Sequence, residues 1–165
     1  MPAMGYLVTM VCSGNTCRSP MAEGILKKAL ADRNVEGIDV LSAGTLGLVG
    51  APATTLAVEV ARSHDVDISA HVSRAFVPEI ARKSDLILAL SREHFDQALQ
   101  LGAAPENVYM LKTFPRRTKD FRSASISDPI GGDRAEYESV FLQIDDAIQP
   151  AVQEIIRRAA TSSST

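Results

Sequence analysis

The chain has 165 residues, of which 45% are hydrophobic and 22% charged, and its formal net charge is −3. This length and composition predict one soluble globular domain with a sizeable core. The small charge gives no reason to expect nucleic-acid or membrane binding, and no apolar run reaches the roughly 20 residues of a membrane-spanning helix. The N-terminus lacks the features of a secretory signal, so we expect a cytoplasmic protein.

The first expected strand, residues 6–11, leads into the most informative stretch of the chain. It is short, apolar and partly β-branched. After the polar loop of residues 12–18, Ser19 suits a helix N-cap, Pro20 the first helical position and Glu23 the first turn. A loop between a strand and a helix N-terminus points several backbone N–H groups at one spot, which predicts an anion site.

Two side chains make this anion site a candidate reaction site. A position beside a helix N-terminus and a guanidinium favours the thiolate form of Cys12, while the rigid fork of Arg18 can clamp two phosphate oxygens. A thiolate at the floor of a phosphate cradle is placed for in-line attack on phosphorus. The spacing alone is also compatible with a buried structural cysteine and a surface arginine, but the flanking elements favour the phosphate loop. The expected phosphate-binding residues are Ser13, Gly14, Asn15, Thr16, Cys17 and Ser19.

Downstream of the loop, extended and helical patterns alternate. The apolar spacing predicts a helix over residues 19–32, a strand at 38–42, a helix over 53–61, a short helix near 76–81, a strand at 85–90, a helix capped by Ser91 through about Leu101, and a strand at 107–111. Strands that alternate with helices imply a parallel, doubly wound sheet. We therefore predict an α/β fold, a single-domain four-stranded parallel sheet of flavodoxin type with helices on both faces and the Cys12 loop at a switch in strand order.

The last third of the chain is predicted to hold a long loop and a long helix. Residues 113–127 are polar, basic and without periodicity, and a loop of that length is usually functional or mobile. A turn at residues 128–132 follows, and a helix then starts at Asp133, which Pro150 should kink or break. The domain is expected to span residues 1–160, with a frayed tail at residues 161–165.

The two cysteines, Cys12 and Cys17, lie within one short loop. A structural disulfide closing so small a loop would stabilise little. Two cysteines without a nearby histidine also do not make a zinc site, so we expect neither a metal nor a cofactor. Reversible oxidation to a Cys12–Cys17 disulfide would protect the thiolate from irreversible over-oxidation.

The chemistry also needs a proton donor and a support for the loop. A carboxylic acid must protonate the leaving group, and Asp128 is the candidate, although Asp-Pro is also a plain turn initiator. Polar side chains must hold a strained phosphate loop open, and Asn15, Ser42 and His71 are the candidates beside their ordinary interpretations as loop, turn and surface residues. The Ser19 hydroxyl can cap the helix or donate to the Cys12 sulfur.

The segment CSGNTCRSPMAE, residues 12–23, closely resembles the active-site signature of the low-molecular-weight protein tyrosine phosphatase family. The resemblance continues through Ser-Ala-Gly-Thr at residues 42–45, His71 and Asp128-Pro129, so it covers nearly the whole chain. It implies a protein phosphatase that forms a phosphocysteine on Cys12, with Asp128 as general acid and phosphorylated proteins as partners. It also implies that Asn15, Ser42 and His71 form the network behind the loop. His64 and His94 match no motif and are expected to be exposed.

Two positions depart from the tyrosine-specific pattern. Thr16 stands where those members usually have a bulky aliphatic residue, and Ile130 follows the Asp-Pro where they tend to have aromatics. A phosphotyrosine ring needs flat apolar walls, whereas a hydroxyl suits a guanidinium. Thr16 resembles the bacterial protein-arginine phosphatase branch, which has an aromatic in place of Ile130. We therefore favour phosphoarginine over phosphotyrosine as substrate. Thr16 is also explained if the loop only needs a small residue there. If the substrate is aromatic, Phe114, Phe121 and Tyr137 are the candidates for a wall against its ring.

Three other functions fit this sequence less well. An arsenate reductase would need further cysteines to relay a disulfide, and Cys17 is the only spare thiol. A phosphotransferase-system carrier phosphorylated on a loop cysteine would have no use for Asp128. A non-catalytic phosphate-binding module would leave Cys12, Arg18 and Asp128 idle together. We therefore predict a phosphatase, and we expect it to be a monomer.

Overall fold

The computed structural model describes residues 5–163 and contains one four-stranded sheet. The strands lie in the order β2-β1-β3-β4, and every pairing is parallel. Their bounds are Tyr6–Cys12 for β1, Ile38–Gly44 for β2, Leu86–Ala89 for β3 and Val108–Met110 for β4. The predicted sheet is therefore confirmed.

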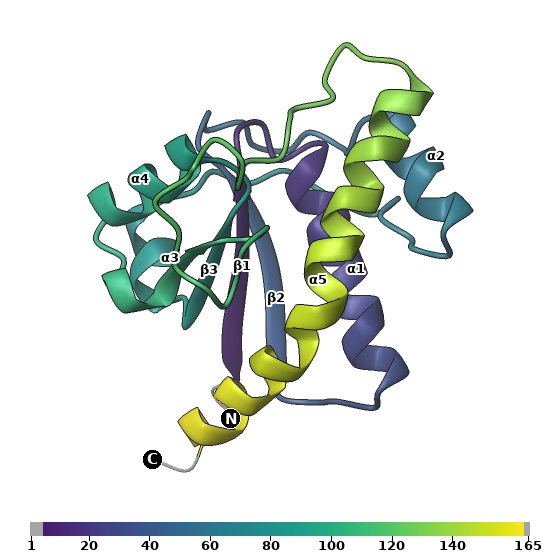
Figure 1. The fold of residues 1–165 in the computed structure, drawn as a ribbon. Coiled ribbons are helices and arrows are strands. Elements are labelled where there is room, and N and C mark those ends of the chain that lie inside the picture. Colours follow the sequence, from purple (N-terminus) through teal and green to yellow (C-terminus); the bar gives the residue numbers. More distant parts are fainter. Residues whose placement is uncertain (1–4, 164–165) are drawn as a thin grey trace.

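Helices cover both faces of the sheet (Figure 1). Helices α1 (Arg18–Asp32), α2 (Thr55–Ser63) and α5 (Arg134–Ser163) pack with the larger apolar core. Helices α3 (Pro78–Lys83) and α4 (Arg92–Gln100) pack with a smaller core on the opposite face. A short 3-10 turn, Pro105–Asn107, precedes β4. Within residues 5–163, no helix is both long and apolar enough to cross a membrane.

The strand order places a switch point beside β1. The chain leaves β1 through α1 to reach β2 on one side, and later returns to β3 on the other side. Ligands of doubly wound sheets bind at such a point, outside the carboxyl ends of the strands. Cys12 is the last residue of β1, so the fold puts the predicted nucleophile there.

The start of α1 differs from the prediction. Its N-cap is Cys17, whose side chain makes no capping hydrogen bond, so Ser19 and Pro20 lie inside the first turn. The predicted N-cap role of Ser19 is wrong, because the helix already begins at Arg18. The Ser19 hydroxyl instead contacts the Cys12 sulfur, which is the other role expected of it. Helix α2 also begins later than predicted, after its N-cap Thr54.

Helix α5 is continuous through Pro150, so the predicted break does not occur. Pro150 and Asp146, whose carbonyl loses its helical partner, are both exposed, and water can satisfy that carbonyl. The helix continues through Ser163, so residues 161–163 of the predicted tail are helical. Residues 164 and 165 of the predicted tail lie outside the described residues, and the domain boundary at residue 160 stays a prediction.

Candidate active site

The end of β2 holds the first half of the loop in place. The carbonyl oxygens of Cys12 and Ser13 accept hydrogen bonds from the backbone N–H groups of Thr45 and Leu46, both at 2.9 Å. This close approach explains Gly44, because a Cβ atom there would lie 2.6 Å from the Ser13 carbonyl oxygen. The glycine of the Ser-Ala-Gly-Thr segment therefore has a packing role at the site.

The second half of the loop is held in the same way. Asn15 has a φ of 58°, the left-handed conformation that asparagine tolerates. Its carbonyl accepts from His71 Nε2 at 2.7 Å, its side-chain oxygen from the Arg74 N–H at 2.8 Å, and the Thr16 carbonyl from the Thr54 N–H at 2.9 Å. The N–H of a trans peptide points away from its C=O. The carbonyls of residues 12, 13, 15 and 16 accept hydrogen bonds from outside the loop. The N–H groups of the same peptides, those of residues 13, 14, 16 and 17, therefore point toward the inside of the loop.

A hydrogen-bonded chain runs from the candidate nucleophile into α1 and β2. Cys12 is 2% exposed, and its Sγ lies 2.8 Å from the Ser19 hydroxyl. The Asn15 amide donates to Ser19 at 2.8 Å and to the Ser42 hydroxyl at 2.9 Å, and Ser42 donates to Glu23 Oε1 at 2.6 Å. The structure thus brings the expected supporting residues together. The anchoring role of Glu23 was missed, although its place one turn after Ser19 puts both on one helix face.

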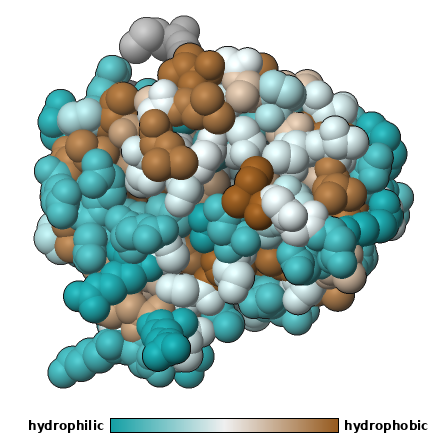
Figure 2. Space-filling view, turned by 90° about the horizontal axis from the view of Figure 1, so that it is seen from above, coloured by the Kyte–Doolittle hydropathy of each residue, from teal (hydrophilic) through white to brown (hydrophobic). Residues whose placement is uncertain are grey.

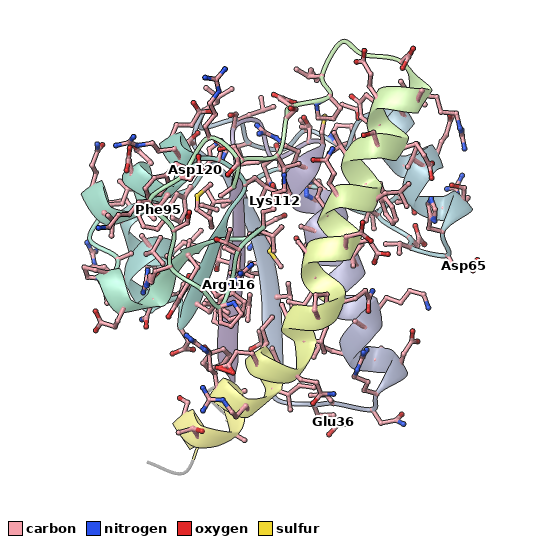
Figure 3. The ribbon with its side chains drawn as sticks, in the orientation of Figure 1. Glu36, Asp65, Phe95, Lys112, Arg116 and Asp120 are labelled. Carbon is pink, nitrogen blue, oxygen red and sulfur yellow. The ribbon has the colours of Figure 1, made fainter. Side chains whose placement is uncertain are left out.

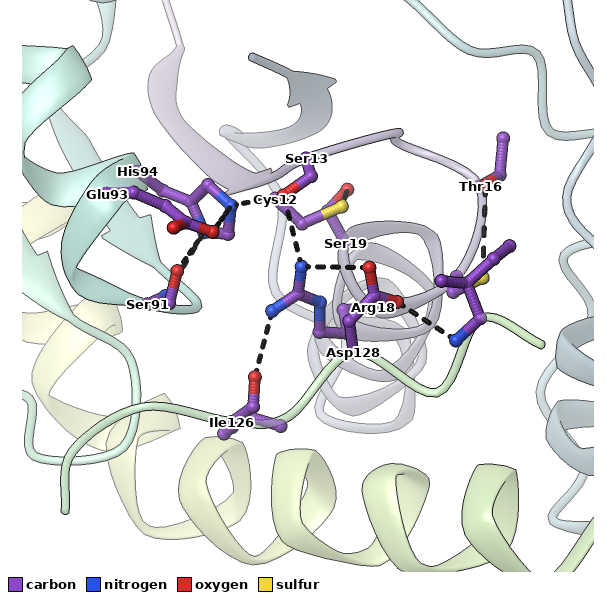
Figure 4. Close-up of polar contacts among 12 residues, drawn as sticks. Cys12, Ser13, Thr16, Arg18, Ser19, Ser91, Glu93, His94, Ile126 and Asp128 are labelled. Atoms are coloured by element: carbon purple, nitrogen blue, oxygen red, sulfur yellow. Dashed lines mark hydrogen bonds and ion pairs between the residues drawn. The ribbon is translucent and has the colours of Figure 1, made fainter. Parts of the chain in front are cut away.

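Arg18 lies beside the end of the long loop, between Ser13 and Ile126 (Figure 4). It is 4% exposed, and its Nη1 donates to the Ile126 carbonyl at 2.9 Å. Its Nη2 lies 3.3 Å from Ser13 Oγ and 3.5 Å from Asp128 Oδ2. Asp128 is 40% exposed, and its Oδ1 accepts from the Ile130 N–H at 3.1 Å. The candidate acid therefore lies at the exposed edge of the phosphate loop, which we call the rim. One of its oxygens faces the Arg18 guanidinium, and the other accepts a hydrogen bond within its own turn.

A cleft of about 530 Å³ opens above these groups, lined among others by Ser13, Arg18, Arg92, Arg122 and Asp128. A larger hollow of about 1320 Å³ lies at the other end of the sheet, and none of the predicted site residues lines it. Within residues 5–163, no group of three or more His, Cys, Asp or Glu side chains is arranged to hold a metal ion.

His94 is the residue that the sequence reasoning placed wrongly. Its side chain is 0% exposed, and its Nε2 lies 2.9 Å from Ser13 Oγ. Burial, with a further contribution from Arg18, lowers the pKa of His94 to about 3. The available signal was its position three residues after the Ser91 N-cap, where a side chain can bond back to the cap. His64 is also not free, because it contacts Glu138.

Cys17 lies in a separate buried environment. Its Sγ is 3.4 Å from the Tyr137 hydroxyl and 3.6 Å from the Thr54 hydroxyl. Burial, together with the hydrogen bond to Cys17, raises the pKa of Tyr137 to about 12, so the phenol stays protonated at neutral pH. Tyr137 is buried in the core, so it forms no substrate wall.

The other candidate walls are also occupied elsewhere. Phe114 is buried, and Phe121 packs edge-on against Phe95 of α4 with ring centroids 5.1 Å apart. Figure 3 shows Phe95 and the nearby Asp120 on the α4 side of the sheet. Figure 2, which looks down on the molecule, shows separate apolar patches on a largely hydrophilic surface. The exposed apolar residues next to the loop and its acid are aliphatic, Leu46 at 75% and Ile130 at 58%.

Comparisons with known proteins identify the family of the chain. Residues 7–161 match the family described as Low molecular weight phosphotyrosine protein phosphatase. The chain is 34% identical to the low molecular weight protein-tyrosine-phosphatase Etp of Escherichia coli K12 over 91% of this chain and 95% of that protein. It is 30% identical to the protein-arginine-phosphatase of Bacillus subtilis, over 90% and 95%.

A solved structure shares the fold. The crystal structure of the Erwinia amylovora tyrosine phosphatase AmsI superposes with a TM-score of 0.79 and 29% identity, covering 93% of this chain and 95% of that one. A match across residues 7–161 spans every strand and the loop that carries Cys12, Arg18 and their partners. The chain is a protein phosphatase that belongs to the low molecular weight phosphotyrosine protein phosphatase family.

Proposed function

We propose that the protein hydrolyses phosphoarginine on proteins through a phosphocysteine intermediate. The observation that carries the choice of substrate is the rim, where Thr16 brings a hydroxyl and Leu46 and Ile130 are aliphatic. The relative in Bacillus subtilis that is named a protein-arginine-phosphatase supports the same substrate. Phosphotyrosine is the alternative, and the relatives named tyrosine phosphatases support it.

In the first half-reaction, the Cys12 thiolate attacks phosphorus, and the bond from phosphorus to the guanidinium nitrogen breaks. Asp128 donates its proton to that nitrogen as it leaves. The backbone N–H groups of the loop and the Arg18 guanidinium hold the phosphoryl oxygens as charge develops on them. The Ser19 hydroxyl, 2.8 Å from the sulfur, donates to the thiolate and stabilises it.

In the second half-reaction, Asp128 acts as a base. Its carboxylate takes a proton from water, and the water oxygen attacks the phosphorus of phosphocysteine. The bond from sulfur to phosphorus breaks, which releases inorganic phosphate and restores the Cys12 thiolate. Asp128 is 40% exposed, so water can reach it. Cys12 is 2% exposed, so the phosphoryl group must enter the phosphate loop to meet the sulfur.

The rim supports a guanidinium better than a phenyl ring. An aromatic ring is stabilised by flat apolar surfaces, and the three candidate aromatics are buried or packed elsewhere. A guanidinium instead needs acceptors in one plane. Asp128 offers a carboxyl group at the rim, whose unprotonated oxygen can accept while the other oxygen carries the proton for the leaving nitrogen, and Thr16 offers a half-buried hydroxyl. These two groups are the proposed contacts of the substrate arginine.

Variants of Thr16 test this choice. The wild type and the variants Thr16→Val and Thr16→Ile are assayed on two peptides of one sequence, one with phosphoarginine and one with phosphotyrosine. Thr16→Val keeps the shape and removes the hydroxyl, while Thr16→Ile also adds bulk. We expect the wild type to prefer phosphoarginine and Thr16→Ile to erase the preference. A preference for phosphotyrosine that the Thr16 variants do not change would show that phosphotyrosine, the alternative, is the substrate.

A cytoplasmic location, a monomeric state and phosphorylated proteins of the cell as substrates complete the proposal. The absence of a membrane-spanning helix among residues 5–163 is compatible with the location. Sedimentation of the purified chain tests the oligomeric state, and fractionation of cells tests the location.

A further inference from the structure

His94 is a buried imidazole that none of the steps above uses. Its Nδ1 lies 3.1 Å from the Ser91 N–H and 3.0 Å from the Ser91 hydroxyl. A backbone N–H can only donate, so Nδ1 is an acceptor and carries no proton. Burial and Arg18 keep the ring neutral at working pH. The single ring proton therefore sits on Nε2.

That proton points at the phosphate loop. Nε2 lies 2.9 Å from Ser13 Oγ, across 81 residues of sequence, and donates to it. Ser13 Oγ also lies 3.3 Å from Nη2 of Arg18, which can only donate. Both lone pairs of the hydroxyl are then engaged, so donation of its own proton is the function left to it. Ser13 lines the same cleft as Arg18 and Asp128. In Figure 4 dashed lines connect His94 to Ser13 and Ser13 to Arg18.

We propose that His94 is a positioning residue for phosphate binding. By donating to Ser13, it fixes the hydroxyl so that one lone pair holds Arg18 Nη2 and the hydroxyl proton faces a phosphoryl oxygen. Without this bond the hydroxyl is free to rotate, and its proton no longer faces the phosphoryl oxygen. His94 itself touches neither the phosphorus nor Cys12. The inference rests on the proposed role of the loop as the phosphate site.

The surroundings of His94 make it a fixed donor and not a pH switch. The positive charge of Arg18 in α1 disfavours protonation of the ring, which would place a second positive charge beside it. The nearest carboxylate, Glu93 on the same helix, is 72% exposed and 3.5 Å from Nε2. Solvent screens a carboxylate in such a position. The neutral ring therefore keeps one hydrogen-bonding direction, from Ser91 through His94 to Ser13.

Two matched variants separate this role from a purely structural one. His94→Asn places an amide near the Nδ1 position and keeps the bond to Ser91, but does not reach Ser13. His94→Gln places an amide nitrogen near the Nε2 position and gives up the bond to Ser91. The readouts are the Kd of inorganic phosphate by calorimetry and the thermal unfolding midpoint. We expect His94→Asn to raise the Kd about tenfold at a nearly unchanged midpoint. We expect His94→Gln to lower the midpoint while the Kd stays within about twofold.

Ser13→Ala provides the second arm and keeps the test open if a His94 variant does not fold. Because His94 acts through Ser13, Ser13→Ala alone should raise the Kd about tenfold. The double variant Ser13→Ala/His94→Asn should show the same tenfold change. Losses that multiply to about a hundredfold would overturn the proposal, as would a wild-type Kd in Ser13→Ala or in His94→Asn. Turnover of an aryl phosphate by the wild type tests the proposed function separately, because the Kd needs no turnover.

Discussion

The floor and the rim of the active site are built differently. On the floor, Cys12, Asn15 and Ser19 are buried and tied to one another by hydrogen bonds of 2.8 Å. At the rim, Asp128 is 40% exposed and Ile130 58% exposed. In the proposed mechanism the floor suits any phosphoryl group, because its donors would meet only the phosphate. The rim would meet the group that carries the phosphate, so we expect specificity to depend on the rim.

The largest effect should come from the centre of the floor. Cys12→Ser replaces the thiolate by a poor nucleophile, and we expect kcat to fall at least about a thousandfold. Inorganic phosphate should still bind, because the loop N–H groups and Arg18 remain. Steady-state kinetics with an aryl phosphate and calorimetry with phosphate measure both. Substantial turnover by Cys12→Ser would contradict attack by sulfur.

Asp128→Asn should have the next largest effect. If Asp128 is the general acid, as proposed, its removal should lower kcat about 10²- to 10⁴-fold for a substrate with a basic leaving group. An aryl phosphate whose leaving group needs no proton serves as the matched control and should lose far less. Equal losses on the two substrates would show that Asp128 shapes the site and does not transfer a proton.

The two cysteines should behave differently under oxidation. Brief peroxide treatment should inactivate the wild type, and a thiol reductant should restore it, if Cys12 and Cys17 pair. Cys17→Ser should lose most of its activity irreversibly under the same treatment. Mass spectrometry of the oxidised protein checks the bond. Full recovery of Cys17→Ser would show that Cys17 does not protect the nucleophile.

A substitution at the rim should change specificity and leave the floor alone. Ile130→Tyr supplies an aromatic wall beside Asp128, and we expect a gain of about 2- to 10-fold in kcat/KM on a phosphotyrosine peptide. The Kd of inorganic phosphate should not move. An unchanged kcat/KM, or a changed phosphate affinity, would break the division between rim and floor.

The last prediction concerns the dependence of stability on pH. The pKa of His94 is lowered to about 3 in the folded protein, whereas an unfolded histidine titrates near 6.5. Between these values the unfolded chain binds more protons, so stability falls as the pH falls, by up to about 1.4 kcal/mol per pH unit. Urea unfolding of the wild type and His94→Asn from pH 7 to pH 4 measures it. Equal slopes would contradict the buried neutral ring.

Local patterns predicted the fold, and the residues that they singled out around Cys12 lie together in the structure. The apolar strand before Cys12, and the loop and helix after it, are adjacent in sequence, so the cradle could be inferred directly. Ser19 shows the limit of that reasoning, because its hydroxyl suits an N-cap locally but is held by Cys12 and Asn15. His94 was missed because its partner Ser13 lies 81 residues away.

A competition experiment tests the central claim most directly. Equal concentrations of a phosphoarginine peptide and a phosphotyrosine peptide of the same sequence are mixed with the wild-type protein, and both are followed by mass spectrometry. The ratio of their first-order decay rates equals the ratio of kcat/KM. We predict faster loss of the phosphoarginine peptide, with none when Cys12→Ser replaces the wild type. Faster loss of the phosphotyrosine peptide would contradict the proposed substrate.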